Sequence, residues 1–293
     1  MHCANWTGVG GAIKPVWGRS ASHNMCMSER QSCWIKLLLL ALLTVLPLSA
    51  TDWRLVWSDE FNGPANSPPD PYKWTYDLGG GGWGNGELET YTDNRANVFQ
   101  DGAGHLVIRA SKTESGGYLS ARLKTQNRFT AKYGKIEARM KIPYGQGMWP
   151  AFWMLGDDVV TAGWPACGEI DVMENIGKEP SVVHGTVHGP GYSGAHGISA
   201  SFSLPGSPPL SRDFHIYGIE WSPERVEFFL DGKSYHTVTP ASLPAGAKWV
   251  YDHPFFLLLN LAVGGAWPGN PDQTTVFPQD LLVDWVRVSQ RTE

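Results

Sequence analysis

The stretch KIEARMKI at residues 135–142 alternates strictly between polar and apolar side chains. Successive side chains of a strand point to opposite faces, so this period of two predicts a half-buried β-strand. Residues 105–110 alternate in the same way, and residues 281–288 predict a closing strand. The runs 226–230 and 234–238 flank an Asp-Gly pair and predict a hairpin.

Residues 255–263 are almost continuously apolar, which is typical of a strand covered on both faces. No segment shows a helical stripe with caps. Many strands joined by Gly-rich turns predict an all-β sandwich of two antiparallel sheets. A curved sandwich of this kind offers a concave cleft in which a polymer can lie.

The first fifty residues differ from the rest of the chain. Residues 37–46 read LLLLALLTVL, preceded by Arg30 and Lys36 and followed by PLSA. A basic region, a short apolar run and a final small residue predict a secretory signal peptide, so we expect a secreted or periplasmic protein. The apolar run is shorter than the roughly 20 residues of a membrane helix, although an uncleaved anchor is the alternative.

This leader is long for a signal, so Met25 or Met27 is an alternative start, which would make residues 1–24 a mis-called extension. Residues 51–293 contain no linker and no internal repeat, and they predict a single domain. The net charge of −5 leaves no basic surface for nucleic acid and suits a neutral substrate. No oligomer interface can be read from the sequence, and we expect a monomer that is free of the membrane after signal cleavage.

Only one of the four cysteines, Cys167, lies outside the leader, so we expect no internal disulfide. Cys167 stands two residues before Glu169, where it could be a reactive thiol. A small buried side chain is the favoured interpretation, because free cysteine usually packs as a hydrophobe.

Residues 168–175 read GEIDVMEN and place three carboxylates within six residues. Glu169 and Asp171 share a strand face, whereas Glu174 joins them only if a β-bulge adds one residue at Val172 or Met173. Such like charges repel, so a strand that needed only stability would rarely carry them. Paired carboxylates are what glycosidic bond cleavage requires; a calcium or surface-charge cluster is the weaker alternative.

The pattern E-x-D-x-x-E at residues 169–174 resembles the signature of glycoside hydrolase family 16. Its extra residue matches the bulged branch of the family, which includes laminarinases and agarases. Further segments resemble the laminarinase branch in the same order along the chain: WGNGELE at 83–89, YGKIEAR at 133–139, WPAFWM at 149–154, NLAVGG at 260–265 and DWVRV at 284–288.

The resemblance implies a β-jelly roll and a retaining endo-hydrolase of β-1,3-glucan. Glu169 would be the nucleophile, Glu174 the general acid and then base, and Asp171 the residue that orients and tunes the nucleophile. Other specificities of the family are open, namely mixed-linkage glucanase, agarase, carrageenase or transglycosylase. A non-catalytic glucan-binding module is disfavoured because both glutamates are present.

The resemblance also implies a set of residues that contact the glucan, among them indoles that offer flat platforms for sugar rings. The set is Asn85, Glu89, Arg128, Trp149, Trp153, Trp164, His188 and Trp267. Catalysis would need no cofactor. Many family members hold a structural cation, for which Glu60 and Gly102 would offer carbonyl oxygens and Asp284 a carboxylate. Such hard oxygen ligands suit Ca²⁺.

Overall fold

The computed structural model describes residues 53–292. The predicted leader and signal peptide at residues 1–50 therefore lie outside the described residues. Within 53–292, no helix is long and apolar enough to cross a membrane.

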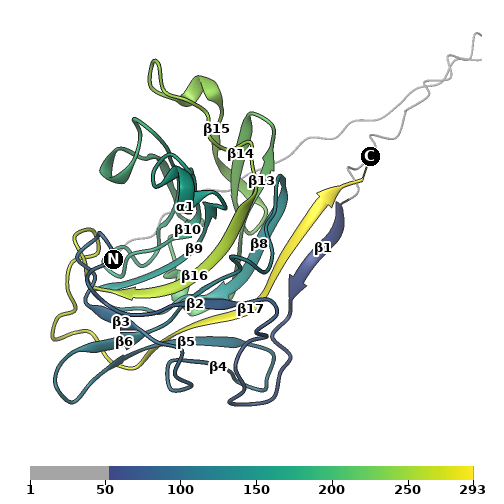
Figure 1. Cartoon of the computed structure of the whole chain (residues 1–293). Coiled ribbons are helices and arrows are strands. Elements are labelled where there is room, and N and C mark those ends of the chain that lie inside the picture. Colours follow the sequence, from purple (N-terminus) through teal and green to yellow (C-terminus); the bar gives the residue numbers. More distant parts are fainter. Residues whose placement is uncertain (1–52, 293) are drawn as a thin grey trace, which may run out of the picture. The chain divides into compact units, whose positions relative to one another are not determined.

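Strands dominate the described chain and form two layers (Figure 1). The ten-stranded sheet has the order β15-β14-β13-β8-β17-β5-β6-β3, with β1 beside β17 and β4 beside β5. The seven-stranded sheet has the order β12-β11-β10-β9-β16-β7-β2. Neighbouring strands are antiparallel except for β3 and β6, which are parallel. The all-β sandwich predicted from the sequence is confirmed.

The strands of the ten-stranded sheet are β1 (Trp53–Asp59), β3 (Glu89–Tyr91), β4 (Val98–Gln100), β5 (Leu106–Lys112), β6 (Tyr118–Ser120), β8 (Gly134–Lys141), β13 (His215–Ser222), β14 (Arg225–Leu230), β15 (Lys233–Val238) and β17 (Gln279–Arg291). Those of the seven-stranded sheet are β2 (Thr75–Asp77), β7 (Arg122–Lys124), β9 (Met148–Gly156), β10 (Glu169–Glu174), β11 (Val183–His188), β12 (Ile198–Phe202) and β16 (Phe255–Val263). The helical segments are short: α1 (Val159–Ala162), η1 (Gly194–His196), η2 (Leu210–Arg212) and η3 (Pro240–Ser242).

The core lies between the sheets and follows the sequence pattern closely. In β8, Ile136, Ala138 and Met140 are fully buried while the residues between them are half-buried, which is the predicted alternation. Every residue of β16 is buried, as its continuous apolar run predicts. Cys167 is also buried and unpaired, which supports a packing role rather than a reactive thiol.

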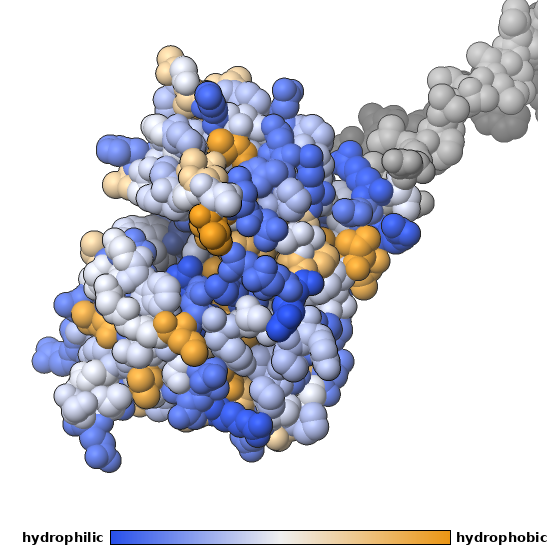
Figure 2. Space-filling model, viewed as in Figure 1, coloured by the Kyte–Doolittle hydropathy of each residue, from blue (hydrophilic) through white to orange (hydrophobic). Residues whose placement is uncertain are grey.

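The predicted hairpin joins β14 to β15 through Asp231 and Gly232. Both turn residues have positive φ, 49° and 74°, as the tight turn of a right-twisted hairpin requires. On the face shown in Figure 2, hydrophobic residues form separate patches among hydrophilic ones, which is normal for an exposed protein surface.

The bulge predicted in the carboxylate strand is present. In the pairing of β10 with β11, Asp171 faces Thr186 and Glu174 faces His184, so three steps on β10 match two on β11. The extra residue restores Glu174 to the face that carries Glu169 and Asp171, and all three side chains line one cleft.

Candidate active site

A cleft of about 940 Å³ lies over the seven-stranded sheet, which supplies its floor through β9, β10 and β11. Loops at either end contribute further walls. Indoles and carboxylates dominate its lining, which includes Trp83, Asn85, Glu87, Arg122, Trp149, Trp153, Trp164, Glu169, Asp171, Glu174, His188, Asn260 and Trp267. The structure therefore brings most of the predicted catalytic and substrate-binding residues into one hollow.

Two indoles each hold one of the outer carboxylates of β10. The Nε1–H of Trp164 donates to Oε2 of Glu169 at 2.7 Å, and that of Trp149 donates to Oε1 of Glu174 at 2.9 Å. His188, opposite Glu169 on β11, has its Nε2 3.1 Å from Oδ2 of Asp171 and 3.8 Å from Oε1 of Glu169. Each carboxylate thus has a fixed direction.

Burial raises the pKa of all three carboxyls. The pKa of Glu169 rises to about 8 through burial and the charge of Asp171, while His188 and the Trp164 N–H oppose the rise. Burial raises the pKa of Asp171 to about 7. The pKa of Glu174 stands well above its ordinary value, first through burial and then through the charge of Asp171. The cluster therefore retains protons near neutral pH, and Glu174 is suited to donate one.

Aromatic side chains form the sugar-facing walls. Trp149 and Trp153 project from the same face of β9 into the cleft, as their even spacing predicts. The Nε1–H of Trp153 donates to Oδ1 of Asn260 at 2.8 Å, which fixes that indole. Trp267 meets Trp149 edge-on at 5.6 Å between ring centroids, and its ring also lies 4.9 Å from the imidazole of His184.

Arg122, on β7, is a cleft residue that the sequence interpretation missed. Its guanidinium lies 4.9 Å from the ring centroid of Trp83 and 4.6 Å from that of Trp153. Its Nε is 3.0 Å from a carboxylate oxygen of Asp77. Cation–π contacts on two sides hold both indoles in place.

Two of the predicted glucan contacts are not among the residues that line the cleft. Arg128 is exposed in the turn after β7 and is not among the residues that line the cleft; the arginine of the cleft is Arg122. Glu89 is only 1% exposed, and its carboxylate accepts the backbone N–H of Val263 at 2.6 Å. Glu89 therefore lies beneath the cleft surface, while its neighbour Glu87 reaches the lining.

Of the predicted calcium ligands, Glu60 follows the end of β1 and Asp284 lies in β17, whereas Gly102 lies in the turn between β4 and β5. Glu60 directly follows β1, whose Asp59 pairs with Val286, so Glu60 and Asp284 are brought near one another by the sheet register. The carboxylate of Glu60 is bound by Arg287, at 3.0 and 2.7 Å, and one oxygen of Asp284 is bound by Arg139. A cation here would use the backbone oxygens and the remaining oxygen of Asp284. This hard-oxygen donor set fits Ca²⁺.

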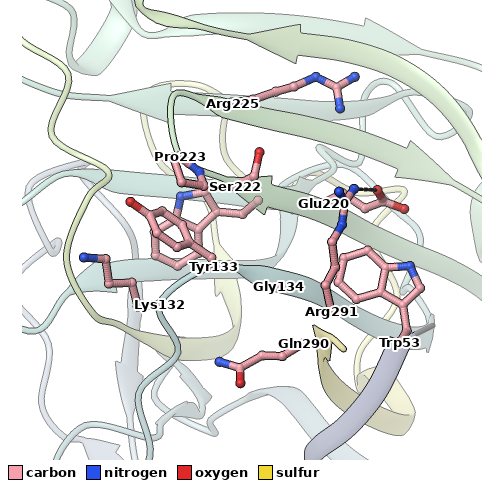
Figure 3. A pocket seen from close by; sticks show the side chains of 11 residues that line it. Trp53, Lys132, Tyr133, Gly134, Glu220, Ser222, Pro223, Arg225, Gln290 and Arg291 are labelled. Atoms are coloured by element: carbon pink, nitrogen blue, oxygen red, sulfur yellow. Dashed lines mark ion pairs between the residues drawn. The ribbon is translucent and has the colours of Figure 1, made fainter. Parts of the chain in front are cut away.

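A second hollow, of about 270 Å³, opens beside β13, β14 and the ends of β1 and β17 (Figure 3). It also contains aromatic and charged side chains, but its one acid and both of its arginines are in ion pairs. Arg291 lies 3.7 Å from Glu220 and covers the ring of Trp53 at 5.3 Å, and Arg225 pairs with Glu227 at 2.7 Å. Among the residues described, none that lines this hollow has a buried polar atom without a partner.

Comparison with known proteins connects this architecture to carbohydrate-active enzymes. The family model for "Glycosyl hydrolases family 16" matches residues 86–287. A β-glucanase of Rhodothermus marinus is 44% identical over 253 residues, which cover 83% of this chain and 87% of that protein.

Two solved structures are also similar. The laminarinase catalytic domain of Thermotoga maritima is 50% identical, with a TM-score of 0.77 over 83% of this chain and 100% of that one. The endo-β-1,3-glucanase of Pyrococcus furiosus is 48% identical, with a TM-score of 0.78 over 84% of this chain and 97% of that one.

Proposed function

The chain belongs to glycoside hydrolase family 16, and on that premise we propose that it is an endo-1,3-β-glucanase that cleaves laminarin-type glucan with retention of configuration. The observation that carries this proposal is the bulged strand β10, which turns three carboxylates into one aromatic-walled cleft. The likeness to laminarinases from two organisms supports the β-1,3 linkage.

In the first step, the ionised carboxylate of Glu169 attacks the anomeric carbon of the sugar. The bond to the leaving oxygen breaks while Glu174 donates its proton to that oxygen, which releases one part of the glucan with a new hydroxyl. The other part remains as a glycosyl ester of Glu169. The Trp164 N–H offsets part of the penalty that burial imposes on the ionised nucleophile.

In the second step, the ionised Glu174 removes a proton from water, and the oxygen of that water attacks the anomeric carbon. The ester bond to Glu169 breaks, and its electron pair returns to the carboxylate. Two displacements at one carbon restore the original configuration. Asp171 and His188, 3.1 Å apart at their closest polar atoms, lie beside Glu169; the charge of Asp171 raises the pKa of the nucleophile, and His188 opposes that rise.

The test is turnover of laminarin, lichenan and agarose by residues 51–293, with Glu169→Gln as the control. Release of short oligosaccharides from laminarin, measured as new reducing ends and as product size, is the expected result. The variant removes the nucleophile and should abolish this release. Turnover of agarose alone would reassign the substrate, and binding without turnover would make the protein a glucan-binding module.

We also propose that the leader exports the protein and that the mature chain acts as a monomer. The basic flank and the short apolar run of residues 30–46 support export. N-terminal sequencing of the secreted product, together with its mass in solution, tests both points. A protein retained in the membrane, or a stable dimer, would contradict them.

A structural calcium held by Glu60, Gly102 and Asp284 is part of the same proposal. A ligand that binds only the folded state raises the melting temperature, so a chelator should lower it and added Ca²⁺ should restore it. The chelator is added to the parent protein and to Asp284→Asn. If it changes the melting temperature of neither protein, the proposal of a structural calcium is wrong.

A further inference from the structure

A second group of carboxylates lies at the end of the cleft away from α1, where Glu87, Glu89 and Tyr91 alternate along one extended segment. Their even spacing directs the three side chains to the same side. Glu89 is almost fully buried, and its Oε2 accepts the backbone N–H of Val263 at 2.6 Å. Its Oε1 is buried with no hydrogen-bond partner among the described residues. An ionised carboxylate left in that state would be strongly destabilising.

Glu87, two residues earlier on the same side of the chain, is the acidic neighbour that raises the pKa of Glu89, and it has two hydrogen-bond partners of its own. Its Oε1 accepts from Nδ2 of Asn85 at 2.9 Å, and its Oε2 accepts from the hydroxyl of Tyr91 at 3.0 Å. Two ionised carboxylates cannot share this buried place without repulsion. One proton on Oε1 of Glu89, donated to Glu87, removes the repulsion and satisfies the orphaned oxygen.

We propose that Glu87 and Glu89 share one proton, and that this pair is a positioning element that keeps this end of the cleft in its glucan-binding form. This inference rests on the function proposed above, since it assumes that the cleft binds glucan. The pair would affect sugar binding and not bond cleavage.

The pair connects two segments that carry cleft residues. Beside the Glu89 contact, the backbone N–H of Leu88 donates to the carbonyl of Val263 at 2.8 Å. The backbone N–H of Ala266 donates to the carbonyl of Asn85, also at 2.8 Å. Trp267, a wall of the cleft, follows directly. Loss of the shared proton would place a second negative charge beneath these two hydrogen-bonded segments. The repulsion would displace Asn85 and Trp267 together.

The surroundings identify Glu89 as the group that titrates. Burial first, and then Glu87, raise the pKa of Glu89 to about 8. Burial holds the pKa of Tyr91 well above its ordinary value, so the phenol stays neutral. Arg122, the cation whose charge acts on Tyr91, pairs with Asp77 at 3.0 Å.

Because the pKa of Glu89 is raised in the folded state, its proton is present below about pH 8 and is lost as the pH rises through that value. We therefore expect the KM for laminarin to rise about tenfold between about pH 6 and pH 9, the size of effect that follows from losing a hydrogen bond to a charged group. The catalytic carboxyls also titrate in this range, but their change of state appears mainly in kcat, so the two sources are separable.

The decisive variant is Glu89→Gln, whose amide supplies a permanent N–H donor to Glu87. We expect the KM of this variant to be nearly independent of pH between about 6 and 9, whereas Glu89→Leu should have a raised KM throughout. A matched control is Glu220→Gln in the second hollow, which should keep the pH profile of the parent protein. An alkaline rise in KM that persists unchanged in Glu89→Gln would overturn the proposal.

A measurement without substrate separates this inference from the proposed function. Carboxyl carbons of ¹³C-labelled glutamate are titrated by NMR in the parent protein and in Glu89→Gln, and the signal missing from the variant belongs to Glu89. Titration near pH 8 supports the shared proton, even if laminarin is not the substrate. Titration near the ordinary value of about 4.3 for glutamate would overturn it, whatever the enzyme hydrolyses.

Discussion

Two groups of carboxylates share one cleft and both have raised pKa values, yet they have different access to a sugar. Glu169, Asp171 and Glu174 face the open cleft. Glu89 lies beneath its surface, and its carboxylate is committed to a backbone N–H and to Glu87. A perturbed pKa therefore does not identify a catalytic acid by itself. What separates the two groups is whether the carboxyl can reach the substrate.

The same change, glutamate to glutamine, should therefore affect different kinetic constants in the two groups. Glu174→Gln removes a proton donor that touches the leaving oxygen, and we expect kcat on laminarin to fall on the order of 10²–10⁴-fold. Glu89→Gln preserves a donor and should act on the pH dependence of KM. Steady-state kinetics of both variants at the same pH values make this comparison directly.

A substrate with an activated aryl leaving group sharpens the distinction within the catalytic group. Such a leaving group departs without a proton, so Glu174→Gln should lose much less activity on an aryl laminaribioside than on laminarin. Glu169→Gln should lose activity on both, because the nucleophile is needed in either case. Equal losses for the two variants on both substrates would contradict the assigned roles.

The two indoles that donate to Glu169 and Glu174 should each affect a different limb of the pH–rate profile. Each N–H stabilises an ionised carboxylate and lowers its pKa. Trp164→Phe should therefore raise the pKa of Glu169 and move the acidic limb of kcat/KM upward. Trp149→Phe should raise the pKa of Glu174 and move the alkaline limb upward. Complete pH–rate profiles check both directions, and a shift of the same limb in both variants would show that the assignments are wrong.

Stability should respond to the catalytic acids in the opposite sense to activity. The raised pKa of Glu169 means that the folded state binds protons more tightly than the unfolded chain, so stability falls as the pH rises from about 4.3 through about 8. Glu169→Gln removes this penalty and should melt several degrees higher than the parent protein near pH 8, at roughly 2–4 °C for each kcal/mol. Calorimetry at both ends of this pH range tests the direction of the change in melting temperature, with Glu114→Gln, at an exposed position, as the control. Equal melting temperatures for Glu169→Gln and the parent protein near pH 8 would contradict the prediction that the ionised Glu169 destabilises the fold.

The local patterns in the sequence predicted the catalytic strand well. The spacing of Glu169, Asp171 and Glu174 was enough to predict the bulge, because only an extra residue places all three on one face. The alternating and continuous apolar runs predicted β8 and β16 for the same reason. These features depend on the geometry of a single strand, which is encoded locally.

The residues at the other end of the cleft depend on how strands pack, and sequence could not place them. The even spacing of Glu87 and Glu89 shows a shared side, but not that the carboxyl of Glu89 would be covered by the end of β16. Arg122 and Arg128 lie six residues apart, and only the pairing of β7 with β16 decides that Arg122 enters the cleft. The sequence alone does not reveal which side chains are buried by strands that lie far away along the chain.

A variant in the second hollow should have the smallest effect on activity, and it serves as a control for the variants in the cleft. It has two tryptophans, a glutamate and two arginines, so by composition it resembles a carbohydrate site. Its Glu220 is paired with Arg291, and that same arginine covers the ring of Trp53. Because the one acid of this hollow is already paired, Trp53→Ala should leave the kcat and KM for laminarin within about twofold. A larger change in KM, at an unchanged melting temperature, would show that glucan binds there and that paired charges do not exclude a sugar site.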